Sequence, residues 1–546
     1  MTKDRQIKQI LALLILSYAV LFYGIGDYSL KEPDEGRYAE IPREMNELHD
    51  YIVPHLNYVR YFEKPPLLYW VDALSFKVLR TNEWSFRFPN ALSALLCVLF
   101  LFIFARRWLG RESAFLSSII LITCFGFFAM ARIVTIDMLF TLCLFLALLS
   151  FHEFYRERKP FFIYLFYAVL GAATLAKGPV ALILLGATIL IFLVTEHNLH
   201  FVPEMRLIRG LAIYLVITLP WIVAISFREK EFLYFFFVDQ HFLRFLTSRH
   251  NRSGPIYYFL PVLFGGMFPW SIFIPRAMAH LFRDKSLRLM VIWAAVVFVF
   301  FSISGSKLPP YILPVFPPLA MVLGHFFQEK WGSLANRWAE GLVYAFIFLI
   351  FALAAALLSF SPLSAYVKNM STDAPLIMKN LALFSIWISL CSFIAGFLFL
   401  SGGLTRYSRI VILLSFFSFA VVCGILLNLG VVDRLNTAKN LAVMINQEKA
   451  KADYVIDYSS YDQTLPFYMR RGITIASYTG ELEMGAKYED AKDIFISDAA
   501  FLDLVSSEKN VLFVTKQKRI KTLEEHFPGR IHVRACENDR CLVANY

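Results

Sequence analysis

The stretch LALFSIWISLCSFIAGFLFL, residues 381–400, holds 20 residues without one charged side chain. A bilayer core of about 30 Å requires roughly 20 apolar residues in each spanning helix, which is the length of this run. Similar uncharged runs occur at 91–104 and 211–221, and over the whole chain 58% of residues are hydrophobic and 17% are charged. Soluble domains carry about 25% charged residues. The sequence therefore predicts a polytopic α-helical membrane protein, with about thirteen transmembrane helices between Ile10 and Leu427.

The positions of the basic residues predict which side of the membrane each connection faces. The first apolar run, 10–25, lacks a small-residue cleavage site after it, so we interpret it as a transmembrane helix rather than a signal peptide. Cytoplasmic loops carry an excess of Lys and Arg. Alternate connections carry that excess: 106–111, 156–159, 206–209, 276–288, 330–337 and 406–409. The other connections and the C-terminal tail then face the non-cytoplasmic side of the membrane.

The tail after residue 432 differs in character from the rest of the chain. Its short β-type runs alternate with polar, helix-compatible stretches, and they lie at 454–458, 473–477, 493–497 and 510–515. We therefore expect a transmembrane domain at 1–432, with juxtamembrane helices in the external loop 27–87, and a soluble α/β domain at 433–546. Cys536 and Cys541 lie close together in this tail and can form a disulfide if the compartment is oxidising.

The first external loop is about sixty residues long, which favours a functional role. It contains PDEGRYAEIPREM at 33–45, where Tyr38, Ile41 and Met45 recur at helical spacing with charges between them. This pattern predicts an amphipathic helix on the membrane surface, kinked or interrupted at Pro42. Acidic residues suit the start of such a helix because its dipole favours anions there. The alternative is that these acids only cap a solvated surface helix.

Ionisable residues recur later in this loop and in the other external connections. They are Lys64 in the run RYFEKPPLLYW at 60–70, Asp137, Lys177, His241 with Arg244, and Lys307 in the run KLPPY at 307–311. One such residue near a membrane can be an internal ion pair, but all of these map to one membrane face, which favours a functional site.

The residue types in this site suit a substrate that combines phosphate with a sugar. Lys and Arg bind phosphate through charge-assisted hydrogen bonds, aromatic rings can cover a sugar or a polyprenyl chain, and carboxylates can accept a proton. The chain has no Gly-rich phosphate loop and no Cys/His metal cluster. Because nucleotide donors are scarce outside the cytoplasm, we expect a lipid-phosphate donor. The net charge of +11 belongs to the membrane part, so nucleic acid is not the expected partner.

Four motifs resemble those of the aminoarabinose (4-amino-4-deoxy-L-arabinose) transferase family, whose members are GT-C fold glycosyltransferases related to protein O-mannosyltransferases. The motifs are DEGRYAEIPREM at 34–45, RYFEKP at 60–65, AKG at 176–178 and KLPPYIL at 307–313. The resemblance implies transfer of the amino sugar from undecaprenyl phosphate to lipid A phosphate on the periplasmic face. That reaction masks negative charge on lipopolysaccharide and confers resistance to polymyxin and cationic peptides.

The same resemblance assigns expected roles to residues of this chain. Asp34 and Asp137 are the candidate catalytic carboxylates. The donor phosphate is expected to contact basic and phenolic side chains, namely Arg37, Lys64, Tyr61, Arg244, Lys307 and Tyr311. Glu35 and Lys177 are further candidates for substrate binding. Glu63 and His241 match family positions that could share a divalent metal ion, the one cofactor considered.

Several alternatives stay open at this point. The aminoarabinose enzymes commonly have Thr where this chain has Gly36, and they also differ at Pro66 and Pro179. Wider relatives with the Gly and double-Pro forms use other polyprenyl-linked sugars, so a galactosamine or a neutral hexose is an alternative donor sugar. A protein or another surface glycan is an alternative acceptor. A lipid-linked sugar transporter without chemistry would instead predict an internal repeat and charges at the membrane midplane, neither of which the sequence contains.

Overall fold

A computed structural model of the chain describes residues 2–236, 254–281, 285–330, 337–359, 374–400, 414–415, 424, 436–448, 451–537 and 539–546. The chain divides into two compact units. The helical unit comprises Met1–Ile25 and Arg87–Leu429, and the α/β unit comprises Gly26–Phe86 and Gly430–Tyr546. The first external loop therefore groups with the C-terminal tail.

The helical unit contains apolar helices of membrane-spanning length. Five spans in the described residues pass by length and composition: α4 (Glu83–Leu109), α7 (Ile136–Glu157), α8 (Pro160–Lys177), α10 (Leu207–Arg228) and the combined η7–α15 segment (Pro309–Glu329). Two bent helix pairs raise that number to seven if each pair is one span. The multi-pass α-helical class is confirmed, whereas the count of about thirteen stays a prediction.

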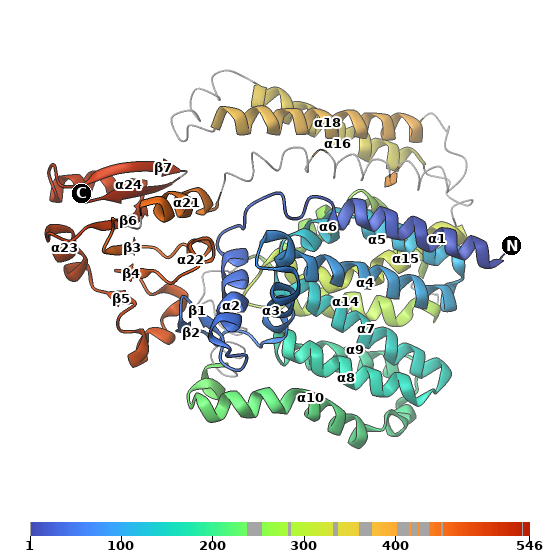
Figure 1. Cartoon of the computed structure of the whole chain (residues 1–546). Coiled ribbons are helices and arrows are strands. Elements are labelled where there is room, and N and C mark those ends of the chain that lie inside the picture. Colours follow the sequence, from blue (N-terminus) through green and yellow to red (C-terminus); the bar gives the residue numbers. More distant parts are fainter. Residues whose placement is uncertain are drawn as a thin grey trace. The chain divides into compact units, whose positions relative to one another are not determined.

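The η7–α15 segment of this unit consists of two elements, and the unit contains further helices and short helical turns. They are α1 (Thr2–Ser17), η1 (Tyr18–Phe22), α5 (Arg111–Thr123), α6 (Phe125–Arg132), α9 (Val180–Thr195), η2 (Leu199–Met205), η4 (Ile256–Tyr258), α12 (Phe259–Gly266), η5 (Trp270–Phe273), α13 (Ile274–Leu281), η6 (Lys285–Leu287), α14 (Arg288–Ile303), η7 (Pro309–Val315), α15 (Phe316–Lys330), α16 (Arg337–Ser359) and α18 (Ala374–Leu400). The uncharged stretch at 381–400 lies in α18, which packs against α16. Figure 1 also shows α7 beside α8, and α7 is buried along most of its length, as expected of a helix that is apolar all round.

The C-terminal part of the α/β unit is a six-stranded mixed sheet. Its strands are β3 (Tyr454–Tyr458), β4 (Thr474–Ala476), β5 (Phe495–Ile496), β6 (Val511–Lys516), β7 (His532–Glu537) and β8 (Arg540–Ala544), in the order β5-β4-β3-β6-β8-β7. The first four strands run parallel, and β7 and β8 form an antiparallel hairpin beside β6. The chain moves from β3 toward β5 and then returns to the other side of β3, so the strand order reverses between β3 and β6.

Helices cover both faces of this sheet, as a parallel sheet requires. The helices are α21 (Lys439–Glu448), α22 (Thr464–Met469), α23 (Asp498–Ser506) and α24 (Gln517–His526), with three short turns at Gly480–Leu482, Gly485–Lys487 and Glu489–Ala491. Alternate residues of β6 face opposite sides: Phe513 packs in the core with α23 and α24, and Leu512 in the core with α21 and α22. The predicted α/β domain is thus observed as a three-layer structure. Cys536 and Cys541, paired across β7 and β8, form a disulfide.

The first external loop supplies two helices and a small hairpin. These are α2 (Asp34–Leu48), β1 (His55–Leu56), β2 (Val59–Arg60) and α3 (Leu67–Leu79). The predicted helix is present as one element, with Pro42 inside it rather than at a break. Its polar side is not solvated, because every residue from Glu35 to Met45 is buried. Contacts with α3 and α22 account for this burial, so the helix packs inside a domain on its charged side as well.

Candidate active site

Asp34 and Arg37 meet in the first turn of α2. The Arg37 guanidinium forms an ion pair with the Asp34 carboxylate through Nη2 and a second one with Glu481 through Nη1. The side chain of Arg37 is 6% exposed, whereas that of Asp34 is 46% exposed. A buried guanidinium beside an accessible carboxylate can stabilise an anion while the carboxylate contacts a second reactant.

Tyr61 completes this group from the segment after β2. Arg37 Nη1 lies 3.5 Å from the Tyr61 hydroxyl, and Tyr61 is buried. Burial raises the pKa of Tyr61 well above its ordinary value, although the nearby Arg37 charge acts in the opposite direction. Burial lowers the pKa of Arg37, but Tyr61, Tyr38, Glu481 and Asp34 together outweigh it and raise that pKa. Tyr61 therefore keeps its proton and can donate a hydrogen bond to a phosphate oxygen.

The other expected residues of the first loop lie close by in sequence. The Glu35 side chain is buried and accepts a hydrogen bond from the backbone of Lys31 at 3.1 Å. That bond joins Glu35 to the segment just before α2, so the Glu35 carboxylate has a structural partner four residues away. Lys64 and Glu63 are half-buried in the segment between β2 and α3, and the Glu63 charge contributes to the raised pKa of Tyr61.

A second group of expected residues lies in the helical unit. Lys177, at the end of α8, forms an ion pair with Asp137, in the first turn of α7. The Lys177 ammonium also lies 4.4 Å from the centre of the Tyr311 ring, a cation–π contact with η7. Residues from three segments far apart in the sequence therefore meet at one place. The side chains of Lys177 and Asp137 are 16% and 11% exposed, so the pair is largely removed from solvent.

Lys307 follows α14 and precedes η7 in the same unit. It is buried, and its ammonium donates to the backbone carbonyl of Ser304 at 2.6 Å. The backbone of Gly254 approaches its side chain so closely that an added Cβ would lie 3.2 Å from Lys307 Cδ. Lys307 is thus held in its own loop, next to the segment that brings Tyr311 to Lys177.

Two expected residues, His241 and Arg244, lie outside the described residues. The structure therefore does not test their roles. In the part of the chain that is described, no group of three or more His, Cys, Asp and Glu side chains is placed to hold a metal ion. A metal shared by Glu63 and His241 stays a prediction, and no chemical step below depends on it.

Glu481, the second carboxylate partner of Arg37, was not predicted from the sequence. Glu481 lies in a short turn after β4, 444 residues away from Arg37. It belongs to no motif, and nothing in its own sequence neighbourhood distinguishes it from other acidic residues of the tail. Only the folding of the first loop together with the tail brings it to Arg37.

Comparison with known proteins agrees with these two parts of the chain. Residues 63–223 match the family model of dolichyl-phosphate-mannose-protein mannosyltransferase, and residues 441–545 match that of the aminoarabinose transferase C-terminal domain. The undecaprenyl phosphate-alpha-4-amino-4-deoxy-L-arabinose arabinosyl transferase of Erwinia tasmaniensis is 27% identical over 540 residues, covering 96% of each chain. The enzyme of that name from Enterobacter sp. is 29% identical and covers 94% of each chain.

A solved structure extends the likeness to the fold. The crystal structure of ArnT from Cupriavidus metallidurans bound to undecaprenyl phosphate matches with a TM-score of 0.84, 27% identity and 98% coverage of both chains. With its apolar helices and its C-terminal sheet domain, the chain is a membrane glycosyltransferase of the GT-C fold class. Within that class it is similar to the aminoarabinose transferases over nearly its full length.

Proposed function

We propose that this protein transfers 4-amino-4-deoxy-L-arabinose, or a closely related amino sugar, from undecaprenyl phosphate to a phosphate of lipid A at the periplasmic face of the inner membrane. The observation that carries the proposal is the full-length likeness to a transferase solved with undecaprenyl phosphate bound. The combination of an accessible carboxylate, a buried guanidinium and a protonated phenol at the start of α2 supports it, because these groups suit a phosphate leaving group.

The reaction breaks the bond between the anomeric carbon of the sugar and the donor phosphate oxygen. Negative charge develops on the phosphate as it leaves, and Arg37 and Lys64 are the cations that we assign to its stabilisation. Tyr61 donates a hydrogen bond to the same group. An acceptor oxygen attacks from the opposite face, so the anomeric configuration inverts. The two products are the glycosylated acceptor and undecaprenyl phosphate.

The need for a base depends on the acceptor. A lipid A phosphate is already anionic, so it can attack without losing a proton. A hydroxyl acceptor would have to give up its proton, and Asp34 is then the first candidate base because its side chain is 46% exposed. With an amino sugar donor, the Asp34 or Asp137 carboxylate can instead bind the ammonium group. Transfer of an amino sugar adds positive charge to lipid A and so weakens its attraction for polymyxin and other cationic peptides.

Mass spectrometry of lipid A tests this proposal. Lipid A is compared from cells that lack the protein and from cells that express the wild-type chain, Asp34→Ala, Lys64→Ala or the control Glu489→Ala. Glu489 is 92% exposed and pairs with a surface lysine, so its loss is expected to leave transfer intact. The expected result is a pentosamine on a lipid A phosphate in the wild type and in the control, and its loss in the other two variants.

Two other outcomes decide between the alternatives. A hexosamine in place of the pentosamine would keep the mechanism and change the donor sugar. Unmodified lipid A in cells that express the wild-type chain would contradict the lipid A assignment. A protein acceptor would then be the next candidate, because residues 63–223 match a family of protein mannosyltransferases.

A further inference from the structure

Gln463 lies between two carboxylates of the α/β unit that come from distant parts of the chain. Its backbone N–H donates to Glu32 at 2.9 Å, and its side-chain amide donates to Glu481 at 3.2 Å. Glu32 precedes α2 by two residues, and Glu481 is the partner of Arg37 inside α2. Gln463, a residue of the C-terminal domain, therefore orients two acids. One is Glu32, just before α2, and the other is Glu481, which pairs with Arg37 in the first turn of α2.

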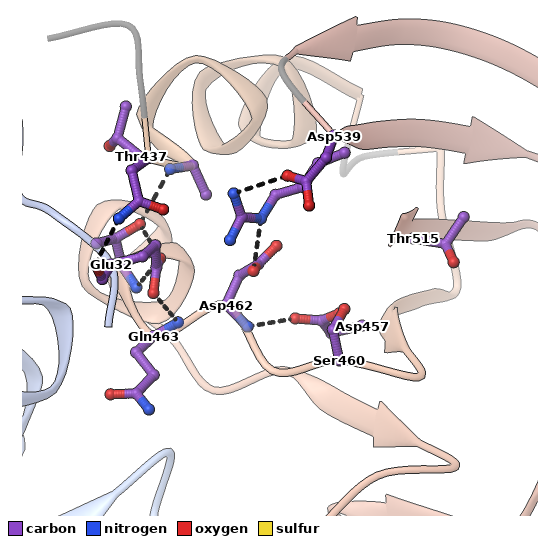
Figure 2. Close-up of polar contacts among 12 residues, drawn as sticks. Glu32, Thr437, Asp457, Ser460, Asp462, Gln463, Thr515 and Asp539 are labelled. Carbon is purple, nitrogen blue, oxygen red and sulfur yellow. Dashed lines mark hydrogen bonds and ion pairs between the residues drawn. The ribbon is translucent and has the colours of Figure 1, made fainter. Parts of the chain in front are cut away.

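Glu32 attaches the loop before α2 to the C-terminal domain. In addition to Gln463, both the backbone N–H and the hydroxyl of Thr464 donate to its carboxylate. Its backbone is held as well, since Glu32 N–H donates to the Asn436 carbonyl at 2.9 Å and the Asn436 amide donates back to the Glu32 carbonyl at 2.6 Å. Figure 2 shows Glu32 reaching the segment that carries Asp462 and Gln463. Asp34 follows Glu32 by two residues, so these contacts of Glu32 also restrict the position of the Asp34 backbone.

Glu481 fixes the direction of the Arg37 side chain. The guanidinium has one carboxylate at each terminal nitrogen: Asp34 at Nη2 and Glu481 at Nη1. Asp34 lies in the same helix turn as Arg37, so that contact alone leaves the side chain free to follow local movements. The contact with Glu481 ties it to the C-terminal domain, and the bond from Gln463 orients Glu481 in turn.

Close packing between α2 and the segment before α22 leaves no room for adjustment. A Cβ added at Gly36 would lie 2.6 Å from the backbone carbonyl carbon of Gln463 and 2.6 Å from the backbone nitrogen of Thr464. Real Cβ atoms do not approach backbone atoms this closely. The absence of a side chain at Gly36 therefore permits the contact that brings Glu32, Gln463 and Glu481 to Arg37.

We propose that the C-terminal domain positions the phosphate-binding arginine of this transferase, with Glu481 as the positioning residue for Arg37 and Glu32 as the attachment of the loop before Asp34. A transition-state charge is stabilised best by groups that are already in place, and a small displacement of such a group can cost about a hundredfold in rate. Glu481 touches no substrate in this account and acts through Arg37. The proposal rests on the proposed transfer reaction.

The test measures donor consumption by the purified full chain in lipid nanodiscs, with undecaprenyl phosphate-linked aminoarabinose and lipid A as substrates. Glu481→Ala is expected to lower kcat by about ten- to a hundredfold, with little change in KM for the donor. Glu481→Gln keeps a hydrogen-bond acceptor and is expected to recover most of that loss. Glu489→Ala, an exposed acid of the same domain, serves as the control and is expected to behave as the wild type. Hydrogen exchange of α22 checks that each variant is folded.

A double variant separates positioning from a general structural effect. In an Arg37→Ala background, Glu481→Ala is expected to cause no further loss, because the residue it orients is gone. Equal activity of the wild type and Glu481→Ala would overturn the inference while leaving the transfer reaction standing. A rise in kcat or an additive loss in the double variant would overturn it as well. An inactive wild-type chain would instead contradict the proposed function.

Discussion

Lys177 and Asp137 form an ion pair that is largely removed from solvent. This pair predicts how substitution of either residue changes the stability of the protein. Removing one partner of a buried pair leaves the other charge unpaired, which costs about 3–5 kcal/mol, whereas removing both is much milder. Lys177→Met is therefore expected to unfold at a clearly lower temperature than the wild type, and the double variant Lys177→Met/Asp137→Asn at a higher temperature than Lys177→Met. Thermal unfolding in one detergent measures both.

An exposed pair provides the control for that comparison. Lys159 and Glu157 lie 3.2 Å apart with side chains 59% and 43% exposed, so Lys159→Met is expected to change stability by less than about 1 kcal/mol. Additive losses from the two substitutions at Lys177 and Asp137 would mean that the pair is not the energetic unit described here.

At the scale of residues, the sequence identified groups that carry charge into apolar surroundings. Asp137 and Lys177 were predicted as ionisable residues of the external connections, and the motif of the first external loop supplied Asp34 and Arg37. The structure brings these four residues into two clusters, one in each unit. Partners without a motif could not be found in this way. Glu481 is one acid among many in a polar tail, and its contact with Arg37 depends on a fold that joins segments 444 residues apart.

At the scale of elements, the contact of α2 with the segment before α22 predicts the effect of a single methyl group. Gly36→Ala places a Cβ against backbone atoms of Gln463 and Thr464, neither of which can rotate away. Such overpacking costs about 1–3 kcal/mol. We expect faster hydrogen exchange in α22 and a lower unfolding temperature.

Gly186→Ala is the matched control because a Cβ at Gly186, inside α9, meets nothing within 4 Å. Alanine favours helix over glycine by about 1 kcal/mol, so this variant is expected to be as stable as the wild type or slightly more stable. Unchanged exchange in α22 of Gly36→Ala would show that the two elements do not pack as described.

The carboxylates at the end of β3 predict a pH dependence for the α/β unit. Burial, then the Asp462 charge, raises the pKa of Asp457 from its ordinary 3.8 to about 8, against hydrogen bonds from Ser460 and the Asp462 backbone and the charge of Arg540. Burial likewise raises the pKa of Glu32, to about 7. The folded state thus holds protons that the unfolded state has lost. This stabilisation is complete below about pH 4 and disappears as the pH rises through 7 to 8.

Hydrogen exchange of β3 and α22 in the full chain, corrected for intrinsic rates, measures this effect between pH 5.5 and 8.5. Protection is expected to fall as the pH rises, and Asp457→Asn is expected to flatten the dependence. The amide can keep both contacts, since its oxygen accepts from Asp462 N–H and its NH₂ can donate to the Ser460 hydroxyl. Protection that increases with pH would mean that these acids are ionised in the folded state at low pH.

The elements that the sequence predicted are those with a strong local pattern. The β-type run at 454–458 is β3 with the same bounds, and the three other runs contain β4, β5 and most of β6. The hairpin of β7 and β8 was not predicted, because β7 is largely exposed and carries His, Arg and Glu rather than a buried apolar face. The sequence predicted α2 correctly as a helix. It did not predict that the charged side of this helix is buried, which contacts with α22 bring about.

At the scale of the whole molecule, alternating basic connections predict the sidedness of both units. Glu489, in the C-terminal domain, is 92% exposed, and the side chain of Lys159, between α7 and α8, is 59% exposed. In spheroplasts, a membrane-impermeant maleimide is expected to label Glu489→Cys directly and Lys159→Cys only after the membrane is permeabilised. The wild-type chain serves as the blank. Labelling of both variants without permeabilisation, or of neither, would contradict the topology.

Group transfer from an undecaprenyl phosphate donor is tested by the products of the purified chain. Nanodiscs holding the wild-type protein, the aminoarabinose-linked donor and lipid A are analysed by mass spectrometry for undecaprenyl phosphate and for modified lipid A. We predict one undecaprenyl phosphate released for each sugar gained by lipid A, and loss of both products in Lys64→Ala. An intact donor and unmodified lipid A with folded protein would contradict group transfer and favour a transporter without chemistry.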